Sequence, residues 1–371
     1  MSLRGLSGRI ALVAGGLVAG VVVAEAGFRL ARPDDAVELL YNAPDNAPNG
    51  MYTTDATVYA IPTPGFRGTQ KSLGYSTELR INQLGLRGPE VGEKDRPRYM
   101  AAGDSFTMAA QVTEAETFVG RLSEDLGFEI LNSGADGYGT HQALERYKQL
   151  DERLDLDGVI LTFFVGNDVH DNVRWPNVQQ EARRMRPGQP LSRRPVGAVH
   201  GFLYKRSALY AAFQMWLRRR SMARPDTPER HRWVSELMLF MREGGGILGA
   251  QIPHTERALR ALSQEVNTRG DTLMVAIAPP AFQIETERLN ATFSLVGLDP
   301  SNATPDAVSN AVLDVLQRNN IAHCDLVEPL RRAHQAGREM YLQYDGHWSP
   351  KGHAVVADVM AKCLKSEVGT Q

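Results

Sequence analysis

Short apolar runs alternate with amphipathic segments between Arg98 and Leu364. This alternation is typical of a parallel sheet with helices on both faces, because neighbouring parallel strands are joined by helical crossovers. Apolar residues at helical spacing, such as Phe118, Val119 and Leu122, indicate helix faces that pack on the sheet. The pattern therefore predicts an α/β domain with a five-stranded parallel sheet, with strands at residues 98–102, 128–132, 158–165, 272–278 and 321–325.

The chain before this domain divides into three segments. Residues 1–32 contain a long apolar run, residues 33–60 are rich in Pro and Asn, and residues 61–97 include an alternating stretch from Thr77 to Ile81. Turn-forming residues without periodicity predict a linker at 33–60, whereas alternation predicts a strand in a lead-in segment at 61–97. The α/β domain then occupies residues 98–371.

A stretch at about residues 173–253 interrupts the alternating pattern. It contains an apolar helix around Leu209–Leu217, the basic run Arg218–Arg220 and a glycine run at Gly244–Gly246 that we expect to be flexible. We interpret it as an insertion that leaves from the carboxyl end of the third strand, where ligands bind in open α/β sheets. Two hypotheses remain: a lid or substrate-recognition element, and a solvated helical excursion.

The amino-terminal segment has features of an export sequence. Arg4 and Arg9 precede an apolar run from Ile10 to Ala24, which is intermediate in length between a signal-peptide core and a membrane span of roughly 20 residues. We favour an uncleaved single-pass membrane anchor, because Gly27, Phe28, Leu30 and Ala31 can extend the helix and the flanking Arg29 and Arg32 can snorkel to the interface. We then expect the α/β domain to lie outside the cytoplasm, in the periplasm or at the cell exterior. A signal peptide cleaved near Ala26 and a buried core helix are the alternatives.

Charge and cysteine content exclude several classes of protein. The formal net charge of −2 provides no general attraction for a polyanion, so nucleic acid is not an expected partner. Cys324 and Cys363 form no C-x-x-C or zinc-type pattern. They fall on a late strand and the final helix, where either a disulfide or two free thiols would be reasonable.

Three candidate loops follow the first three strands. Ser105, in Gly-Asp-Ser-Phe, can present its hydroxyl above the sheet as a nucleophile, with neighbouring backbone N–H groups facing a developing oxyanion. Gly137 lies in a glycine-rich loop that allows close approach of the backbone to a ligand, and the Asn167 side chain can donate to an oxyanion. Each loop alone could be an ordinary turn.

A fourth candidate motif, Tyr344-Asp345-Gly346-His347-Trp348, precedes the last helix. His347 can accept the proton of a nearby serine, and Asp345 can hold the imidazole in the required tautomer. Asp345, His347 and His353 are also metal-ligand types, but His353 is expected inside the helix and no paired ligand spacing supports a metal site.

Taken together, these four loops resemble the blocks that define the SGNH/GDSL hydrolases. Ser105 in Gly-Asp-Ser, Gly137, Asn167 in Gly-Asn-Asp and His347 occur in the family's order, and residues 82–88 resemble the lead-in of its membrane-anchored bacterial members. The resemblance implies a flavodoxin-like fold, ester hydrolysis or acyl transfer without a metal or other cofactor, and an oxyanion hole formed by Ser105, Gly137 and Asn167. Asp104 and Asp168, beside the serine and the asparagine, are expected to support the site.

The sequence departs from the family's usual D-x-x-H spacing. Position 344 is Tyr, and the carboxylate is Asp345, two residues before His347, so either Asp345 or a backbone carbonyl could orient the histidine. A D-x-H-W arrangement resembles polysaccharide O-acetyltransferase relatives. We therefore expect a serine esterase acting on an acylated, especially O-acetylated, envelope glycan or lipid. The alternatives are an exopolysaccharide O-acetyltransferase and a non-catalytic polysaccharide-binding scaffold.

Overall fold

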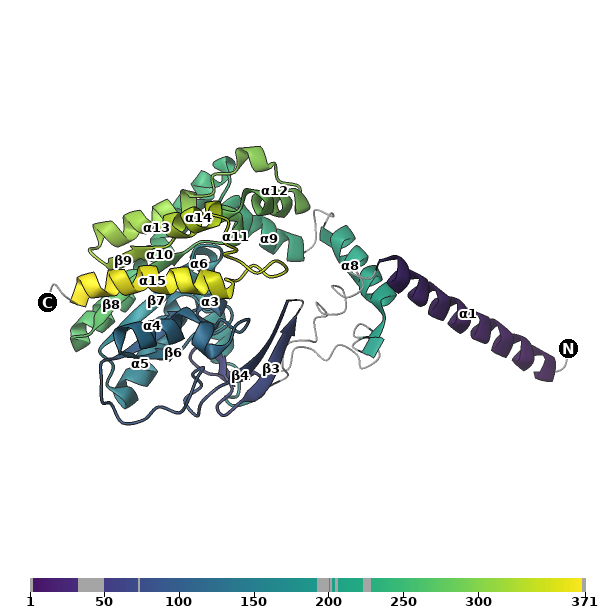
Figure 1. The fold of residues 1–371 in the computed structure, drawn as a ribbon, viewed down its shortest axis with the longest axis horizontal. Helices are drawn as coiled ribbons and strands as arrows, with labels where there is room; N and C mark the ends of the chain where they lie inside the picture. The colour runs from purple at the N-terminus through teal and green to yellow at the C-terminus, as the bar shows by residue number, and fades with distance from the viewer. Residues whose placement is uncertain are drawn as a thin grey trace. The chain divides into compact units, whose positions relative to one another are not determined.

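The computed structural model describes residues 3–32, 50–72, 74–191, 200, 202–203, 206–222 and 228–368. Contacts divide the chain into two compact units. Unit 1 contains Met1–Ala47, Lys71–Leu73 and Ser192–Ser221, and unit 2 contains Pro48–Gln70, Gly74–Leu191 and Met222–Gln371. Part of the insertion expected within the α/β domain thus belongs to unit 1 (Figure 1).

Unit 2 is built around a five-stranded parallel sheet in the order β6-β5-β7-β8-β9. Numbered along the chain, this is the 2-1-3-4-5 order of flavodoxin-like sheets, whose ligands bind where the order reverses, here between β5 and β7. The predicted strands are confirmed to within a residue or two at their ends. Their bounds are Arg98–Gly103 for β5, Glu129–Asn132 for β6, Gly158–Phe164 for β7, Thr272–Ala278 for β8 and Ala322–Asp325 for β9.

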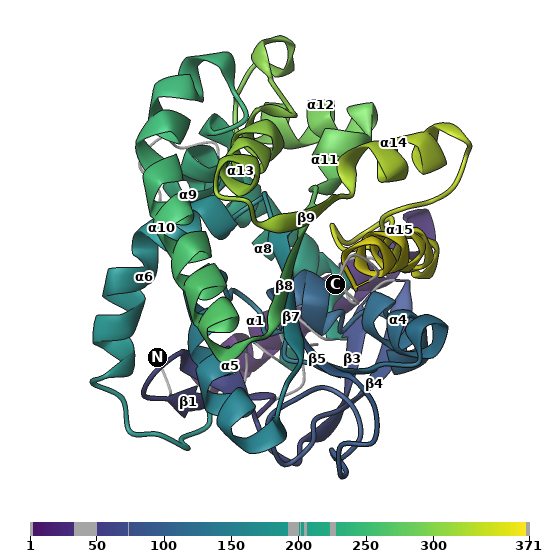
Figure 2. The same ribbon diagram turned by 90° about the vertical axis from the view of Figure 1, so that its left-hand side faces the viewer.

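Helices cover both faces of this sheet. On one face α4 (Phe118–Leu126) packs against α15 (Pro350–Val368), and on the other α10 (Gly245–Arg269) packs against α5 (Thr140–Leu154) and α13 (Ala307–Arg318) (Figure 2). The remaining helices of unit 2 are α3 (Ser105–Met108), α6 (Asp168–Ala182), α9 (Pro228–Met238), α11 (Ala281–Ile284), α12 (Thr286–Leu295) and α14 (Val327–Gln335), with short 3-10 turns η2 (Glu114–Glu116), η3 (Arg242–Gly244) and η4 (Pro300–Asn302).

The core of unit 2 follows the predicted apolar stripes. Phe118 and Leu122 of α4 and Val312 of α13 are fully buried, as the helical spacing predicted. A capping box is also present, since Thr113 and Glu116 bond each other at the start of η2. The packed helices and the buried strands together fix the position of the loops at the carboxyl edge of the sheet.

Two expectations about flexible segments were wrong. The predicted linker at 33–60 ends earlier, because Tyr52–Asp55 (β1) pairs with Tyr59–Pro62 (β2) in an antiparallel hairpin rich in aromatic and β-branched residues. Residues 33–49 lie outside the described residues. The glycine run at 244–246 is also ordered as helix, with Gly245 opening α10. A Cβ at Gly244 would meet Met238 O at 1.6 Å, so that glycine permits close packing.

The lead-in segment contains β3 (Arg67–Ser72) and β4 (Tyr75–Arg80), a two-stranded sheet. The predicted strand from Thr77 to Ile81 corresponds to β4 with a shift of about one residue at its end. Asn82 folds the following turn, accepting hydrogen bonds from Leu84 N at 2.9 Å and Leu86 N at 3.0 Å. This turn directs Arg87 into the interior.

Cys324 and Cys363 are joined by a disulfide, with their Cα atoms 6.0 Å apart. The bond links β9 to α15, the helix that begins just after the histidine motif. Of the two alternatives that the sequence left open, the structure shows the bonded pair.

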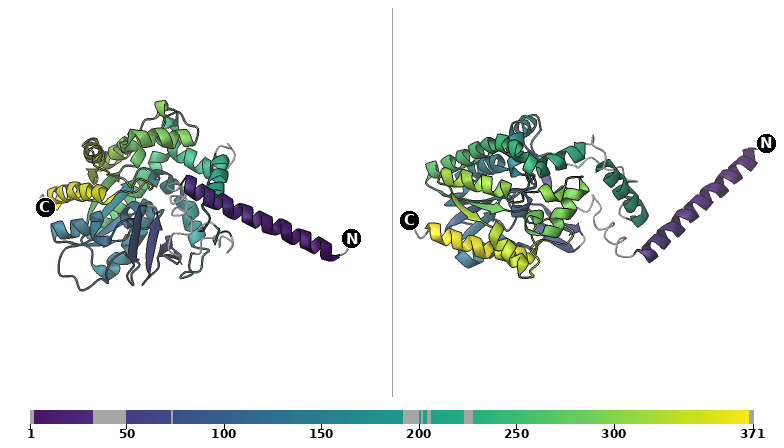
Figure 3. Two further views of the ribbon diagram at one scale, coloured as in Figure 1. Left: turned by 45° about the vertical axis from the view of Figure 1, so that its right-hand side comes forward. Right: turned by 90° about the horizontal axis from the view of Figure 1, so that it is seen from above.

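Unit 1 contains two described helices, α1 (Leu3–Ala31) and α8 (Ala208–Met222). Figure 3 shows α1 as one continuous helix. Among the residues that the structure describes, no helix combines the length and the apolar character needed to cross a membrane.

Candidate active site

The turn after β5 positions Ser105. Gly103 ends the strand at φ +145°, and a Cβ there would meet Thr162 O at 2.7 Å, so only glycine fits. Asp104 then caps the short helix α3 by accepting a hydrogen bond from Phe106 N at 2.9 Å. Ser105, the first residue of α3, is partly exposed at the carboxyl edge of the sheet.

Ser105 contacts the predicted base. Its Oγ lies 2.7 Å from His347 Nε2, and His347 Nδ1 contacts Asp345 Oδ1. The same carboxylate oxygen accepts a hydrogen bond from the His347 backbone N–H at 2.9 Å. Serine, histidine and aspartate are thus linked in the arrangement in which a histidine deprotonates a serine and a carboxylate fixes its tautomer. The two-residue spacing still lets the carboxylate reach the imidazole.

Neighbouring side chains hold Asp345 and His347 in position. Tyr75 of β4 donates its hydroxyl to Asp345 Oδ2 at 3.2 Å, and Arg288 of α12 donates to the carbonyl oxygen of Asp345 at 3.3 Å. The Phe106 ring lies 4.8 Å from the imidazole of His347, centroid to centroid. Neither Tyr75 nor Arg288 lies in a sequence motif that would have identified it as a neighbour of the site.

The charges of the pair shift both pKa values. Burial alone would lower the pKa of His347, but the hydrogen bond and negative charge of Asp345 outweigh it and raise the pKa above its usual value. Burial would raise the pKa of Asp345, but the contacts with His347 outweigh it and lower the pKa. Asp345 is therefore ionised whenever His347 is titrating, and the imidazolium is stabilised.

Gln111 is a further neighbour of the base that the sequence did not reveal. Its Nε2 lies 3.1 Å from His347 Nδ1, while its Oε1 is buried with no partner among the described residues. Nδ1 of His347 carries the proton that it donates to Asp345, and Nε2 of Gln111 is also a donor, so these two nitrogens cannot bond each other. If the Gln111 amide is turned by half a rotation, its Oε1 faces Nδ1–H and gives it a second acceptor. Thr77 holds this residue by donating to Gln111 O at 2.9 Å.

Arg87 stabilises the segment that follows Ser105 through hydrogen bonds to its backbone. Its guanidinium is buried and donates to Met108 O at 2.6 Å, Ala109 O at 2.5 Å and Val112 O at 2.6 Å. Burial lowers the pKa of Arg87 to about 10, so the side chain stays charged at neutral pH. Charge-assisted bonds to three carbonyls hold the end of α3 and the segment that carries Gln111.

The candidate oxyanion residues flank the serine turn. Gly137, at φ +76°, follows β6, and Asn167 directly precedes α6 after β7, so their loops border the carboxyl end of β5 on its two sides. The loop after β6 also packs closely on α3, because a Cβ at Gly134 would meet Met108 N at 2.3 Å. The Asn167 Oδ1 is buried without a partner among the described residues.

Asp104 and Asp168, the expected supporting residues, are buried carboxyl groups that bond the backbone. Asp168 Oδ2 accepts from Phe164 N at 3.0 Å, at the end of β7. Burial raises the pKa of Asp104 to about 7, and burial followed by the charge of Asp104 raises the pKa of Asp168 well above its usual value. Asp104 thus fixes the turn that contains Ser105, and Asp168 fixes the turn that contains Asn167.

His353 belongs to the core. It is 1% exposed in α15, and its Nδ1 accepts a hydrogen bond from Phe118 N at 3.2 Å. Burial lowers the pKa of His353 to about 3, which keeps the ring neutral. Among the described ranges, no three His, Cys, Asp or Glu side chains gather in a way that could hold a metal ion.

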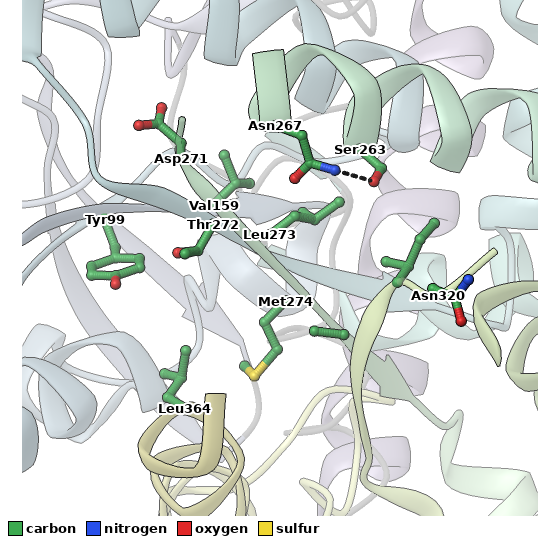
Figure 4. Close-up of a pocket in the computed structure, with 12 residues that line it drawn as sticks. Tyr99, Val159, Ser263, Asn267, Asp271, Thr272, Leu273, Met274, Asn320 and Leu364 are labelled. Carbon is green, nitrogen blue, oxygen red and sulfur yellow. Dashed lines mark hydrogen bonds between the residues drawn. The ribbon is translucent and has the colours of Figure 1, made fainter. Parts of the chain in front are cut away.

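A separate cavity of about 180 Å³ lies at the opposite edge of the sheet (Figure 4). It is lined by Tyr99, Asp271 and Thr272, among others, near the amino ends of β7, β8 and β9. The length of the strands separates this cavity from Ser105 and His347, which lie at the carboxyl edge.

A comparison with protein families identifies the carboxyl-terminal part of the chain. Residues 239–371 match the family model described as "SGNH hydrolase-like domain, acetyltransferase AlgX". The resemblance to SGNH/GDSL hydrolases, with likeness to an acetyltransferase, is thereby confirmed. The matched range contains Asp345 and His347, whereas Ser105, Gly137 and Asn167 precede it.

Solved structures of GDSL-type and related hydrolases show distant similarity. LAE5, an α/β hydrolase from the metagenome of Lake Arreo, Spain, is 15% identical with a TM-score of 0.40, covering 73% of this chain and 96% of its own. A catalytic mutant of Axe2, an acetylxylan esterase from Geobacillus stearothermophilus, is 13% identical with a TM-score of 0.39, covering 74% and 96%. A lipolytic G-D-S-L family protein from Veillonella parvula is 12% identical with a TM-score of 0.39, covering 71% and 96%. No curated protein matches the chain.

Proposed function

We propose that the chain is a serine-dependent carboxylic ester hydrolase. The observation that carries this proposal is the 2.7 Å contact between Ser105 Oγ and His347 Nε2, with Asp345 on the far nitrogen of the ring. In this geometry His347 takes the serine proton as Oγ attacks the ester carbonyl, and Asp345 stabilises the resulting imidazolium.

The negative charge that develops on the carbonyl oxygen needs hydrogen-bond donors. We assign this role to the backbone N–H groups of Ser105 and Gly137 and to the Asn167 side-chain amide, whose loops border the same sheet edge. Collapse of the tetrahedral intermediate expels the alcohol, which receives the proton from His347. Water, deprotonated by His347, then releases the acid from the acyl-serine.

For the substrate, we propose an O-acyl group, in particular an acetyl ester, on an envelope glycan or lipid. The description of the matched family as an acetyltransferase supports an acetyl group. It also supports a second candidate function, O-acetyl transfer, in which a glycan hydroxyl takes the place of water at the acyl-serine. The same catalytic groups serve both reactions, because only the acceptor differs.

We further propose that unit 2 works outside the cytoplasm, in the periplasm or at the cell exterior, and remains associated with the membrane through α1. The disulfide between Cys324 and Cys363 supports this location, because such bonds persist in oxidising compartments and are rare in the cytosol. The apolar run of α1 preceded by Arg4 and Arg9 supports export.

The activity is tested with the purified full chain in detergent, using p-nitrophenyl acetate and O-acetylated envelope polysaccharide. We expect Ser105→Ala to lower kcat by at least about a thousandfold. Ser263 lies beside the cavity at the opposite edge of the sheet. The variant Ser263→Ala is therefore the matched control and should retain activity. Mass spectrometry of released and transferred acetyl distinguishes hydrolysis from transfer. If both variants and the native chain bind the polysaccharide without any turnover, the chain is a binding scaffold and the enzyme assignment is wrong.

A further inference from the structure

The exposed large apolar side chains of the described residues are concentrated in unit 1. Twelve of the sixteen lie on α1 and on residues 202–217, and four are scattered over unit 2. Scattered apolar residues are normal on a protein surface, whereas a contiguous group marks a contact with another apolar phase. Those on α1 are Leu12, Val13, Leu17, Val18, Val21, Val22, Val23 and Leu30.

The second part of this group, on and just before α8, combines aromatic rings with arginine. Phe213 and Trp216 are each 50% exposed and stack at 5.9 Å. The Arg220 guanidinium lies 5.2 Å above the Trp216 ring, and the Arg206 guanidinium 4.5 Å above the ring of Phe202, which is 56% exposed. Tryptophan and arginine in such pairs suit the boundary between lipid headgroups and acyl chains, where one side is apolar and the other is charged.

The charge of this segment is strongly one-sided. Residues 192–221 contain seven Lys and Arg and no Asp or Glu, although the whole chain has a formal net charge of −2. Basic residues beside exposed aromatic rings favour an anionic lipid surface.

A partly buried polar clasp joins α8 to the apolar helix α1. The Glu25 carboxylate of α1 accepts hydrogen bonds from Ser207 Oγ at 2.8 Å, Ala208 N at 2.8 Å and Leu209 N at 3.0 Å, and it pairs with Arg29 Nε at 2.6 Å. Two of these bonds satisfy the first two backbone N–H groups of α8. Figure 3 shows the amino end of α8 beside the carboxyl end of α1.

We propose that α8 is an interfacial helix that rests on an anionic membrane surface and that Glu25 holds it there at the end of α1. The two helices then present one continuous apolar surface, and the arginines reach the headgroup phosphates. Cleavage after Ala26 would remove Glu25 from the chain and leave Ala208 N and Leu209 N without their carboxylate partner. The proposal therefore also requires that α1 is retained.

The test places an environment-sensitive fluorophore on α8 of the full chain. Phe213→Cys is labelled with nitrobenzoxadiazole, and Leu295→Cys, 53% exposed on α12 of unit 2, is the matched control. The native cysteines are both in the disulfide, so the new thiol is the only one to react. Vesicles of phosphatidylglycerol and phosphatidylcholine should shift the emission of the label at position 213 to the blue and raise its intensity severalfold, without changing the label at 295.

A second variant tests the clasp. In Glu25→Gln, with the same label at 213, vesicle flotation should persist through α1 while the blue shift is reduced or lost. Cleavage of a soluble ester by each labelled chain serves as the folding control, since neither position belongs to the catalytic site. A label at 213 that stays in water while the chain floats with the vesicles would overturn the proposal. A blue shift without vesicles that grows with protein concentration, or one produced by a soluble anionic polysaccharide, would also overturn it, in favour of a second copy or a glycan.

Discussion

The Oγ of Ser105 lies 2.7 Å from Nε2 of His347, and the opposite nitrogen of the ring contacts the Asp345 carboxylate. The histidine can accept the serine proton only when it is neutral, so its pKa determines the pH range in which the site works. Because Asp345 raises that pKa, the site needs a higher pH than an isolated histidine would.

The acidic limb of the pH profile of ester cleavage should therefore lie at higher pH than an isolated histidine would give. We expect kcat/KM to fall as the pH drops through an apparent pKa above the ordinary histidine value of about 6.5. Asp345→Asn removes the negative charge, so the limb should move to lower pH while the maximal rate also falls. Stopped assays across the pH range with p-nitrophenyl acetate measure both effects. An unchanged limb in Asp345→Asn would show that another group sets the pKa of His347.

Loss of Gln111 should affect catalysis more than binding. In Gln111→Leu the amide beside His347 Nδ1 is gone, so the ring is less well positioned, and we expect kcat to fall with little change in KM. Gln111→Glu would instead add a negative charge next to the ring and shift the acidic limb of the pH profile further upward. A fall in thermal stability without either kinetic change would assign Gln111 a purely structural role.

Removal of the Asn167 amide tests the oxyanion assignment. Loss of one donor to a developing oxyanion typically lowers kcat about a hundred- to a thousandfold. Asn167→Ala should show a loss of this size with a far smaller change in KM. If affinity falls while turnover is kept, Asn167 binds substrate or supports α6, and the oxyanion is stabilised by other groups.

Arg87 should be required for stability as well as for turnover. Arg87→Ala leaves three buried carbonyl oxygens without their donor, which should lower the free energy of unfolding by about 3 kcal/mol or more. Arg80→Ala is the control, because Arg80 forms an exposed pair with Glu114 that contributes at most about 1 kcal/mol. Urea unfolding followed by tryptophan fluorescence measures the difference. Equal effects of the two substitutions would show that the buried bonds do not brace the turn.

The disulfide should stabilise unit 2. Replacing both Cys324 and Cys363 with Ser should lower the free energy of unfolding by about 2–4 kcal/mol, since the bond closes a loop across 39 residues. Activity should persist at low temperature, because neither sulfur touches Ser105 or His347. Urea unfolding and ester cleavage of the purified double variant measure the two quantities. A double variant as stable as the native chain would contradict this expectation.

The sheet and the four loops were predictable because their signals are local. Buried parallel strands appear as continuous apolar runs, and the turns that follow them need glycine, as Gly103 illustrates. The hairpin at 52–62 was missed because Pro and Asn nearby outweighed a short alternating pattern. Its residues are held in part by distant partners, such as Gln189 O, which accepts a hydrogen bond from Thr54 N at 2.8 Å.

The residues that position the site were not predictable, because each acts through a contact distant in sequence. Gln111 and His347 are 236 residues apart, and Tyr75 and Asp345 are 270 residues apart. Neither Gln111 nor Tyr75 stands in a recognisable motif, and only the folded chain brings them to the histidine. Glu25 and its contacts with α8, 182 to 184 residues away, are a third example.

The separation between the nucleophile and its base also bears on the order in which the site folds. The bonds from Arg87 to the serine turn cross only 21 to 25 residues, whereas the contact between Ser105 and His347 crosses 242. Closing the longer loop costs more chain entropy, so the serine turn can become ordered before the base arrives. A partly folded chain would then hold a structured serine with no group to deprotonate it. The nucleophile would remain chemically silent until the last helix docks on the sheet.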